Sequence, residues 1–110
     1  MTAPPESGTN LPLGEVHIRN NESASRYELL IGGELASILD YRVIGDRIVF
    51  PHTQTDQRFQ GNGLAAQVVR AALDDARLAK RQVVPGCWFV AEFIDDHPDY
   101  RDLVSPAVAP

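Results

Sequence analysis

The hydrophobic period of this 110-residue chain changes near residue 62, and that change constrains the fold more than any other feature. Before it, apolar and polar residues alternate in short runs, which is typical of half-buried strands. After it, Leu64, Val68 and Leu73 belong to an apolar set that recurs at helical spacing over about five turns. The chain therefore has a strand half and a helix half, which predicts a single α+β domain.

The strand half predicts an antiparallel meander. Four strands are expected, at 15–19, 26–31, 34–44 and 47–50. The third is long enough to bend or to carry a bulge. Gly32-Gly33 and Gly45-Asp46 suit the tight turns on either side of it. Pro51 has no backbone donor, so we expect it to limit pairing after the fourth strand.

Two further elements are expected after the long helix. The segment 82–85 is short and apolar, which predicts a buried strand. Because it follows a helix, parallel pairing with an earlier strand is favoured. The segment 87–95 predicts a second, short helix, with Trp88 and Phe89 in the core.

Composition excludes several classes of function. Ten Lys and Arg against fifteen Asp and Glu give a net charge of −5, which argues against a nucleic-acid or anionic-membrane partner. No apolar run approaches the ~20 residues that span a bilayer, and the first residues do not resemble a signal peptide. One cysteine excludes an internal disulfide and a cysteine zinc cluster, and three scattered histidines predict no metal site. We therefore expect a cytoplasmic domain at 14–104, flanked by disordered tails at 1–13 and 105–110.

A glycine-rich loop, Gln60-Gly61-Asn62-Gly63, leads directly into the long helix. The first N–H groups of a helix are unpaired, and its dipole adds partial positive charge there. Two glycines let an anion approach closely, so phosphate is the expected guest. The alternative is an ordinary helix entry in which the glycines only relieve a tight turn. The loop lacks the Lys-Ser/Thr of a P-loop and the Gly-x-Gly-x-x-Gly spacing of a dinucleotide fold.

Six short motifs follow one another in the order seen in one protein family. They are Arg-Tyr-Glu-Leu (26–29), Asp-Tyr-Arg (40–42), His-Thr (52–53), Gly-x-Gly-Leu-Ala (61–65), Val-Pro-x-Cys (84–87) and His-Pro-x-Tyr (97–100). Residues 60–65 also match a Gln/Arg-x-x-Gly-x-Gly/Ala signature, which a register starting at Arg58 satisfies as well. Over residues 15–104 the chain resembles the small single-domain members of the GNAT superfamily of acetyl-CoA-dependent N-acetyltransferases.

The resemblance implies a GNAT-like mixed sheet, in which the meander is followed by a long helix, a splayed strand and a short C-terminal helix. The splayed segments are 47–54 and 82–86, and the pantetheine amides of acetyl-CoA pair with the open strand edge. The implied cofactor-binding residues are His52, Thr53, Arg58, Gln60, Gly61, Asn62, Gly63, Leu64 and Ala65. Among them, Arg58 is a candidate cation for the phosphates.

Cys87 and His52 are the predicted catalytic residues. Cys87 follows Pro85-Gly86 and opens the second predicted helix, where a thiol pKa is lowered. Two interpretations stay open, a nucleophile that accepts the acetyl group or a buried residue that lines the cleft. We expect His52 to face the cleft from the end of the fourth strand. It either acts as a base, a role that suits histidine, or braces the loop by hydrogen bonding. The segment Asp40-Tyr41-Arg42 either forms a charge pair within the sheet or lines the acceptor side.

The resemblance implies transfer of an acetyl group from acetyl-CoA to an amine. Only six residues separate Arg19 from Arg26, too few for the helices that full-size relatives carry there. The acceptor side should therefore be open. Either the substrate is large, such as a protein lysine or N-terminus, or a second subunit in a homodimer closes the site, or the protein is a non-catalytic acyl-CoA-binding module. A domain whose loop binds nothing is a further alternative, and the acidic balance favours a cationic acceptor.

Overall fold

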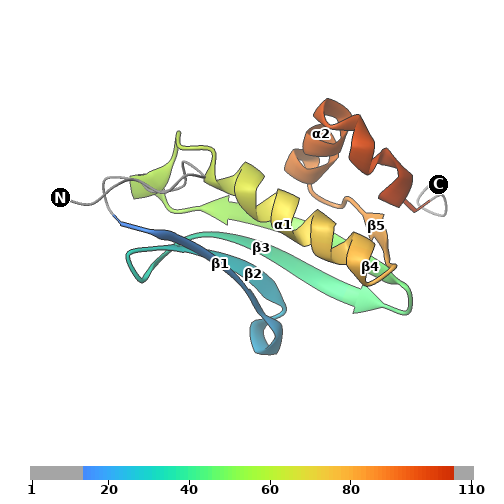
Figure 1. Ribbon diagram of the computed structural model, residues 1–110, viewed down its shortest axis with the longest axis horizontal. Coiled ribbons are helices and arrows are strands. Elements are labelled where there is room, and N and C mark those ends of the chain that lie inside the picture. Colours follow the sequence, from blue (N-terminus) through green and yellow to red (C-terminus); the bar gives the residue numbers. More distant parts are fainter. Residues whose placement is uncertain (1–13, 106–110) are drawn as a thin grey trace.

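The computed structural model describes residues 14–105 (Figure 1). The elements are β1 (Val16–Asn21), the 3-10 turn η1 (Glu22–Ala24), β2 (Arg26–Ile31), β3 (Glu34–Ile44), β4 (Arg47–Thr55), η2 (Gln57–Phe59), α1 (Leu64–Leu78), β5 (Gln82–Val84), α2 (Trp88–Asp96) and η3 (Pro98–Leu103). The tail predicted at 1–13 lies outside the described residues, as do residues 106–110 of the tail predicted at 105–110. Ser105, which we assigned to the C-terminal tail, is instead buried, and its N–H donates to the Val83 carbonyl at 2.9 Å. Within 14–105 no helix combines the length and apolar character needed to cross a bilayer.

Five strands form one sheet in chain order. β1 to β4 are antiparallel and β5 is parallel to β4, which confirms the predicted α+β class, meander and parallel strand. Gly33 and Gly45 adopt φ values of 86° and 62° in the two tight turns. β3 carries the bulge that its length predicted, at Ala36 against β2. Between β1 and β2 the chain makes only the short turn η1.

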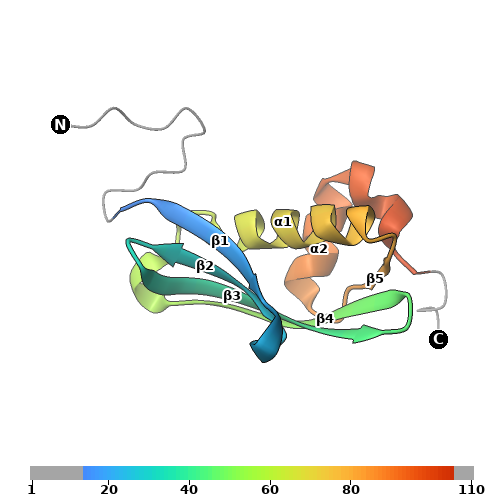
Figure 2. The same ribbon diagram turned by 60° about the horizontal axis from the view of Figure 1, so that its bottom comes forward.

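The core lies between the sheet and α1. α1 crosses one face of the sheet, and α2 and η3 lie beside it near β5 (Figure 2). Leu29, Leu39 and Phe50 from the sheet and Val69 and Leu73 from α1 are each 0% exposed. α1 has 15 residues, close to four turns and fewer than the five predicted. No α-helix of the described chain covers the opposite face of the sheet (Figure 2).

β4 carries a second bulge, at Phe50 and Pro51, which together lie opposite Tyr41 alone. We expected Pro51 to limit pairing, and this was wrong, because β4 stays paired with β3 to the end of the strand. A bulge tolerates a proline because the extra residue needs no ladder bond. The extra residue also reverses the faces taken by the side chains that follow. Thr53 therefore lies on the helix side of β4, and His52 on the open side.

β5 pairs with β4 over three residues only, from Gln82 to Val84. Pro85 has no N–H to continue the ladder, and the Gly86 N–H turns back to the Val84 carbonyl at 2.9 Å. The chain then enters α2. Val49 is the last residue of β4 that pairs with β5, and β4 continues for six more residues to Thr55. The two strands therefore separate after a short pairing, which leaves the second half of β4 with a free edge.

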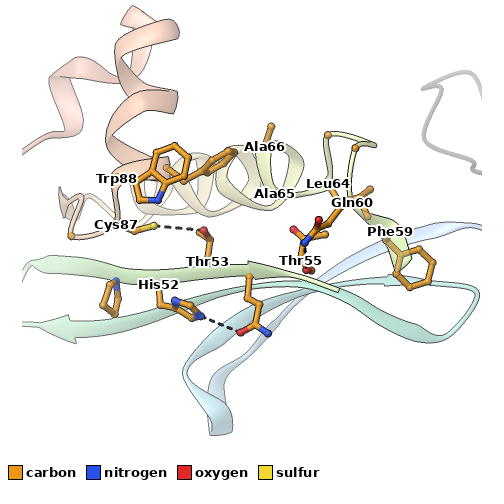
Figure 3. Close-up of a pocket in the computed structure, with 16 residues that line it drawn as sticks. His52, Thr53, Thr55, Phe59, Gln60, Leu64, Ala65, Ala66, Cys87 and Trp88 are labelled. Carbon is orange, nitrogen blue, oxygen red and sulfur yellow. Dashed lines mark hydrogen bonds between the residues drawn. The ribbon is translucent and has the colours of Figure 1, made fainter. Parts of the chain in front are cut away.

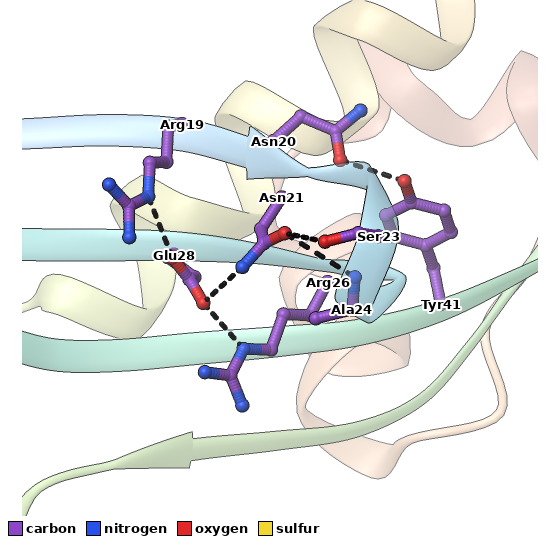
Figure 4. Close-up of polar contacts among 8 residues, drawn as sticks. All are labelled: Arg19, Asn20, Asn21, Ser23, Ala24, Arg26, Glu28 and Tyr41. Atoms are coloured by element: carbon purple, nitrogen blue, oxygen red, sulfur yellow. Dashed lines mark hydrogen bonds and ion pairs between the residues drawn. The ribbon is translucent and has the colours of Figure 1, made fainter.

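Glu28, near the middle of β2, is 1% exposed although it lies on the face opposite α1 (Figure 4). Its carboxylate accepts hydrogen bonds from Arg19 Nε at 2.7 Å, Arg26 Nε at 2.6 Å and Asn21 Nδ2 at 3.1 Å. Burial raises the pKa of Glu28, but the three donors outweigh it and hold the pKa at about 2. The cluster ties β1 to β2 and engages the guanidinium of Arg26.

We predict that Glu28→Gln lowers the free energy of unfolding at pH 7 by about 3 kcal/mol, since it removes the charge that both arginines contact. The pKa of Glu28 is about 2 in the folded protein, against an ordinary value of 4.5 for a glutamate. The stabilisation by its charge is therefore complete above pH 5 and disappears as pH falls toward 2. Urea unfolding at several pH values should show the gap between wild type and variant closing over that range.

The matched control is Glu34→Gln, which removes an exposed ion pair with Arg58 and should change stability by less than about 1 kcal/mol. A gap between wild type and Glu28→Gln that stays constant from pH 7 to pH 2 contradicts the role assigned to the Glu28 charge.

Candidate functional site

A cavity of about 770 Å³ opens where β4 and β5 separate (Figure 3). Its walls are the second half of β4, the glycine loop, the first turn of α1 and the start of α2. It brings together most of the predicted site residues: His52, Thr53, Gln60, Gly61, Gly63, Leu64, Ala65 and Cys87. Arg58 and Asn62 do not line it. The cavity volume is in the range of small-molecule and cofactor sites.

The glycine loop has open space where side chains would lie. Gly61 and Gly63 adopt φ values of 86° and 70°, which favour glycine, but a Cβ on either would meet no atom within 4 Å. Asn62 lies behind the loop and braces it, because its Nδ2 donates to the Phe59 carbonyl at 2.9 Å. The N–H groups of residues 64–66 have no acceptor within the helix, because the first bond of α1 runs from the Gln67 N–H to the Gly63 carbonyl at 3.3 Å. Open space over unpaired donors fits a phosphate group.

The free edge of β4 supplies a second set of backbone groups. The Asp56 N–H donates to the Ala36 carbonyl at 2.8 Å, so even-numbered residues at this end of β4 face β3. Backbone groups alternate along a strand, and those of Thr53 and Thr55 therefore point to the side where β5 has ended. Gln60 Nε2 reaches the Thr55 carbonyl on this side at 3.3 Å. An extended ligand with amide groups can pair here as an added strand.

Cys87 immediately precedes α2, and its Sγ lies 3.6 Å from Thr53 Oγ1 (Figure 3). Burial raises the pKa of the Cys87 thiol, but the Thr53 hydroxyl and the backbone N–H groups of Phe89, Val90 and Thr53 outweigh it. The pKa therefore lies below its ordinary value. Cys87 is also buried, with 9% of its surface exposed, and it belongs to the hydrophobic core, so the lowered pKa is the feature that favours a reactive thiolate.

His52 does not face Cys87. Its side chain lies on the other side of β4 from Thr53, where Nε2 and Gln54 Oε1 are 3.2 Å apart (Figure 3). We expected His52 to face the cleft from the end of the strand, but the bulge in β4 reverses its face. His52 and Gln54 still line the cavity, so the cavity extends around the free edge of β4 to both faces of the sheet.

Arg58, the expected phosphate cation, lies outside the cavity. Its Nη1 donates to Glu34 Oε1 at 3.0 Å, and its Nε donates to Asp56 Oδ1 at 3.1 Å. Asp56 also accepts the Arg58 backbone N–H at 2.9 Å, so these contacts hold the side chain at η2. Backbone N–H groups, rather than an arginine, are therefore the donors that the cavity presents at the loop.

Trp88 is a residue of the site that the sequence analysis assigned to the core. It is 73% exposed, lines the cavity beside Cys87, and meets the Phe89 ring edge-on at a centroid distance of 5.8 Å. As the first residue of α2 it precedes the helix turn that packs into the core, which is why helical periodicity misplaced it. Its position directly after Cys87 was the available signal.

The match to a family model decides the family. The model of the GCN5-related N-acetyl-transferases matches residues 26–103. The chain belongs to the GCN5-related N-acetyltransferase family. Protein NATD1 of Mus musculus is 23% identical over 97 residues, which cover 84% of this chain and 88% of the mouse protein. Protein NATD1 of Bos taurus is 30% identical over 73 residues, which cover 64% of this chain and 65% of the bovine protein.

A solved structure shows the same fold. The NMR structure of a GCN5-like protein from Staphylococcus aureus superposes with a TM-score of 0.62 at 15% identity. The match covers 86% of this chain and 91% of that protein. The GNAT-like arrangement of meander, long helix and parallel fifth strand is therefore confirmed as the family fold.

We predict that Thr53→Val raises the pKa of the Cys87 thiol, because it removes the hydroxyl that favours the thiolate. Cys87 is the only cysteine of the chain, so the iodoacetamide alkylation rate measured against pH reports it alone. The midpoint should shift to higher pH in Thr53→Val.

Thr55→Val is the control, because the Thr55 hydroxyl contacts Ser37 Oγ at 2.9 Å, and its alkylation midpoint should match the wild type. The same midpoint in Thr53→Val and wild type is incompatible with the effect assigned to the Thr53 hydroxyl.

Proposed function

We propose that this domain is an acetyl-CoA-dependent N-acetyltransferase whose acceptor is an amine. The observation that carries the proposal is the free edge of β4 next to the open glycine loop. The strand edge matches a chain of amides, and the glycine loop matches a diphosphate. Both kinds of group occur in CoA. Family membership supports the same conclusion.

The chain's own backbone would provide most of the cofactor contacts. The N–H groups from Gly61 to Ala65 would hold the diphosphate, and the Thr53 carbonyl and the Thr55 N–H would pair with the pantetheine amides. Asn62 and Gln60 support these surfaces through their contacts with the Phe59 and Thr55 carbonyls. Bound acetyl-CoA supplies an activated acetyl group as a thioester.

Two titratable side chains line the cavity, Cys87 and His52. Cys87 holds a sulfur of lowered pKa on the helix side of β4, suited to act as a nucleophile. His52 lies on the open side and would accept a proton at a ring nitrogen from an incoming ammonium group, since an amine attacks only when neutral. The acceptor would be large, such as a protein, because no α-helix of residues 14–105 covers the open face (Figure 2).

A non-catalytic acyl-CoA-binding module is the second candidate. It is favoured by the cavity lining, which within residues 14–105 includes no Asp or Glu, and by the separation of His52 from Cys87 across β4. Both candidates require the same cofactor surfaces, so a binding test and a turnover test are both needed.

Binding is tested with a pair of variants at Gly61. Asn and Asp have the same size and both tolerate positive φ, but only Asp places a negative charge over the loop. Acetyl-CoA should raise the Tm of wild type and of Gly61→Asn. At a concentration one hundred times Kd, the bound ligand adds about 2.7 kcal/mol to the free energy of unfolding. Gly61→Asp should lose this shift, and an equal shift in both variants contradicts a phosphate site at the loop.

Turnover separates the two candidates. Chromatography should detect free CoA released from acetyl-CoA faster in the presence of a panel of amines, including lysine-containing peptides, than in their absence. Stabilisation by acetyl-CoA without amine-dependent release supports the binding module instead. Absence of any stabilisation at millimolar acetyl-CoA contradicts both.

A further inference from the structure

We propose that Asp40 binds the ammonium group of the acceptor, a lysine side chain of a polypeptide lying across the open face of the sheet. This inference rests on the proposed function and names its substrate class. It assigns a residue that lies outside the cavity described above.

Arg26, Asp40 and His52 form a row across the sheet. Arg26 of β2 is the strand partner of Asp40 in β3, and Asp40 is the partner of His52 in β4. Directly paired residues put their side chains on the same face, with Cβ atoms about 5 Å apart. This face is the one opposite α1. Asp40 is therefore the nearest carboxylate to His52 in the neighbouring strand.

The side chains on either side of Asp40 have other partners. Arg26 Nε donates to Glu28 Oε2 at 2.6 Å, within the buried cluster of Figure 4. His52 is in contact with Gln54 at 3.2 Å. Within residues 14–105 the half-buried Asp40 carboxylate has neither a hydrogen bond nor an ion pair. A carboxylate partly withdrawn from water and left without a partner is suited to bind a cation.

A hollow on the same face lies next to Asp40, whose strand partner Arg26 lines it. The hollow has a volume of about 310 Å³, and its lining includes Arg26, Leu35 and Ile38. Asp56 is the carboxylate in its lining, and Asp56 is paired with Arg58. Gln54 lines both this hollow and the cavity, so the two meet at the free edge of β4. Ile38 lies two residues before Asp40 on the same face of β3.

These features match the two parts of a lysine side chain. Leu35 and Ile38 offer apolar contact for the methylene stem, and Asp40 offers the charge for its end. His52, next in the row, lies where it can take the proton from the bound ammonium. The open face suits a polypeptide better than a small amine, since a small amine would leave most of it uncovered. The net charge of −5 also favours a cationic partner.

Arg42 is the other cation close to Asp40 on this face, two residues further along β3. It is exposed, and no ion pair links it to Asp40 in the described chain. Its charge repels an ammonium group at Asp40. The proposal therefore predicts effects of opposite sign for variants at Asp40 and Arg42, which a general change in folding would not produce.

The test is a titration of the ¹⁵N-labelled full chain, without acyl donor, with a blocked peptide that contains one lysine. Amide shifts should change most in β3 and β4 around Asp40 and His52. Asp40→Asn should raise the peptide Kd at least about fivefold, whereas Arg42→Gln should lower it. Asp46→Asn, in the exposed β3–β4 turn, should leave the Kd unchanged. The same peptide with its lysine acetylated should bind as weakly to wild type as the unmodified peptide binds to Asp40→Asn.

Shifts that map to another face, or a Kd unaltered by Asp40→Asn, overturn the assignment. Because the titration needs no turnover, the two proposals can fail separately. Amine-dependent CoA release that does not depend on Asp40 overturns the role of Asp40 but supports the proposed acetyltransferase activity. Lysine binding at Asp40 with no CoA release supports the site and overturns the enzyme.

Discussion

The short pairing of β5 with β4 is the constraint on which the rest of this structure depends. Three pairs join the strands, and the ladder then stops because Pro85 cannot donate and Gly86 turns back on Val84. A longer β5 would pair with the remaining edge of β4 and leave no cavity there. The early end of β5 also places α2, and with it Cys87 and Trp88, directly beside that edge.

The bulge at Phe50-Pro51 gives the exposed part of β4 two different sides. Before the bulge, Phe50 packs into the core under α1. After it, Thr53 faces Cys87 while His52 faces the open side of the sheet. The free edge of β4 therefore separates a helix side, which holds the thiol and the glycine loop, from an open side, which holds the histidine and Asp40. This division is the physical basis for placing donor and acceptor on opposite sides of one strand.

Much of the fold follows from local patterns in the sequence. The alternation before residue 62, the glycine turns and the apolar period of α1 depend on near neighbours, and they placed the elements within a few residues. The six motifs then identified the family and the glycine loop. The cavity residues Thr53, Gln60 and Cys87 were found in this way.

The errors arose where long-range geometry decides. We predicted that Pro51 ends the strand and that His52 faces the cleft. The register between β3 and β4 instead places Pro51 in a bulge and the His52 side chain on the open face of the sheet. Ion pairs with Asp56 and Glu34 hold the Arg58 side chain outside the cavity. Trp88 was misplaced because periodicity cannot show which residue precedes the buried turn of a short helix. None of these outcomes is visible in residue spacing alone.

The most direct test of this account is hydrogen exchange at the Thr55 amide, measured by NMR with and without CoA. The account predicts fast exchange in the free protein, because this N–H faces the side where β5 has ended, and at least about tenfold slower exchange with CoA bound, because the added strand accepts it. The neighbouring Gln54 amide, which faces β3, should be protected in both states. Slow exchange at Thr55 in the free protein, or exchange that CoA leaves unchanged, would contradict the claim that the free edge of β4 holds the cofactor.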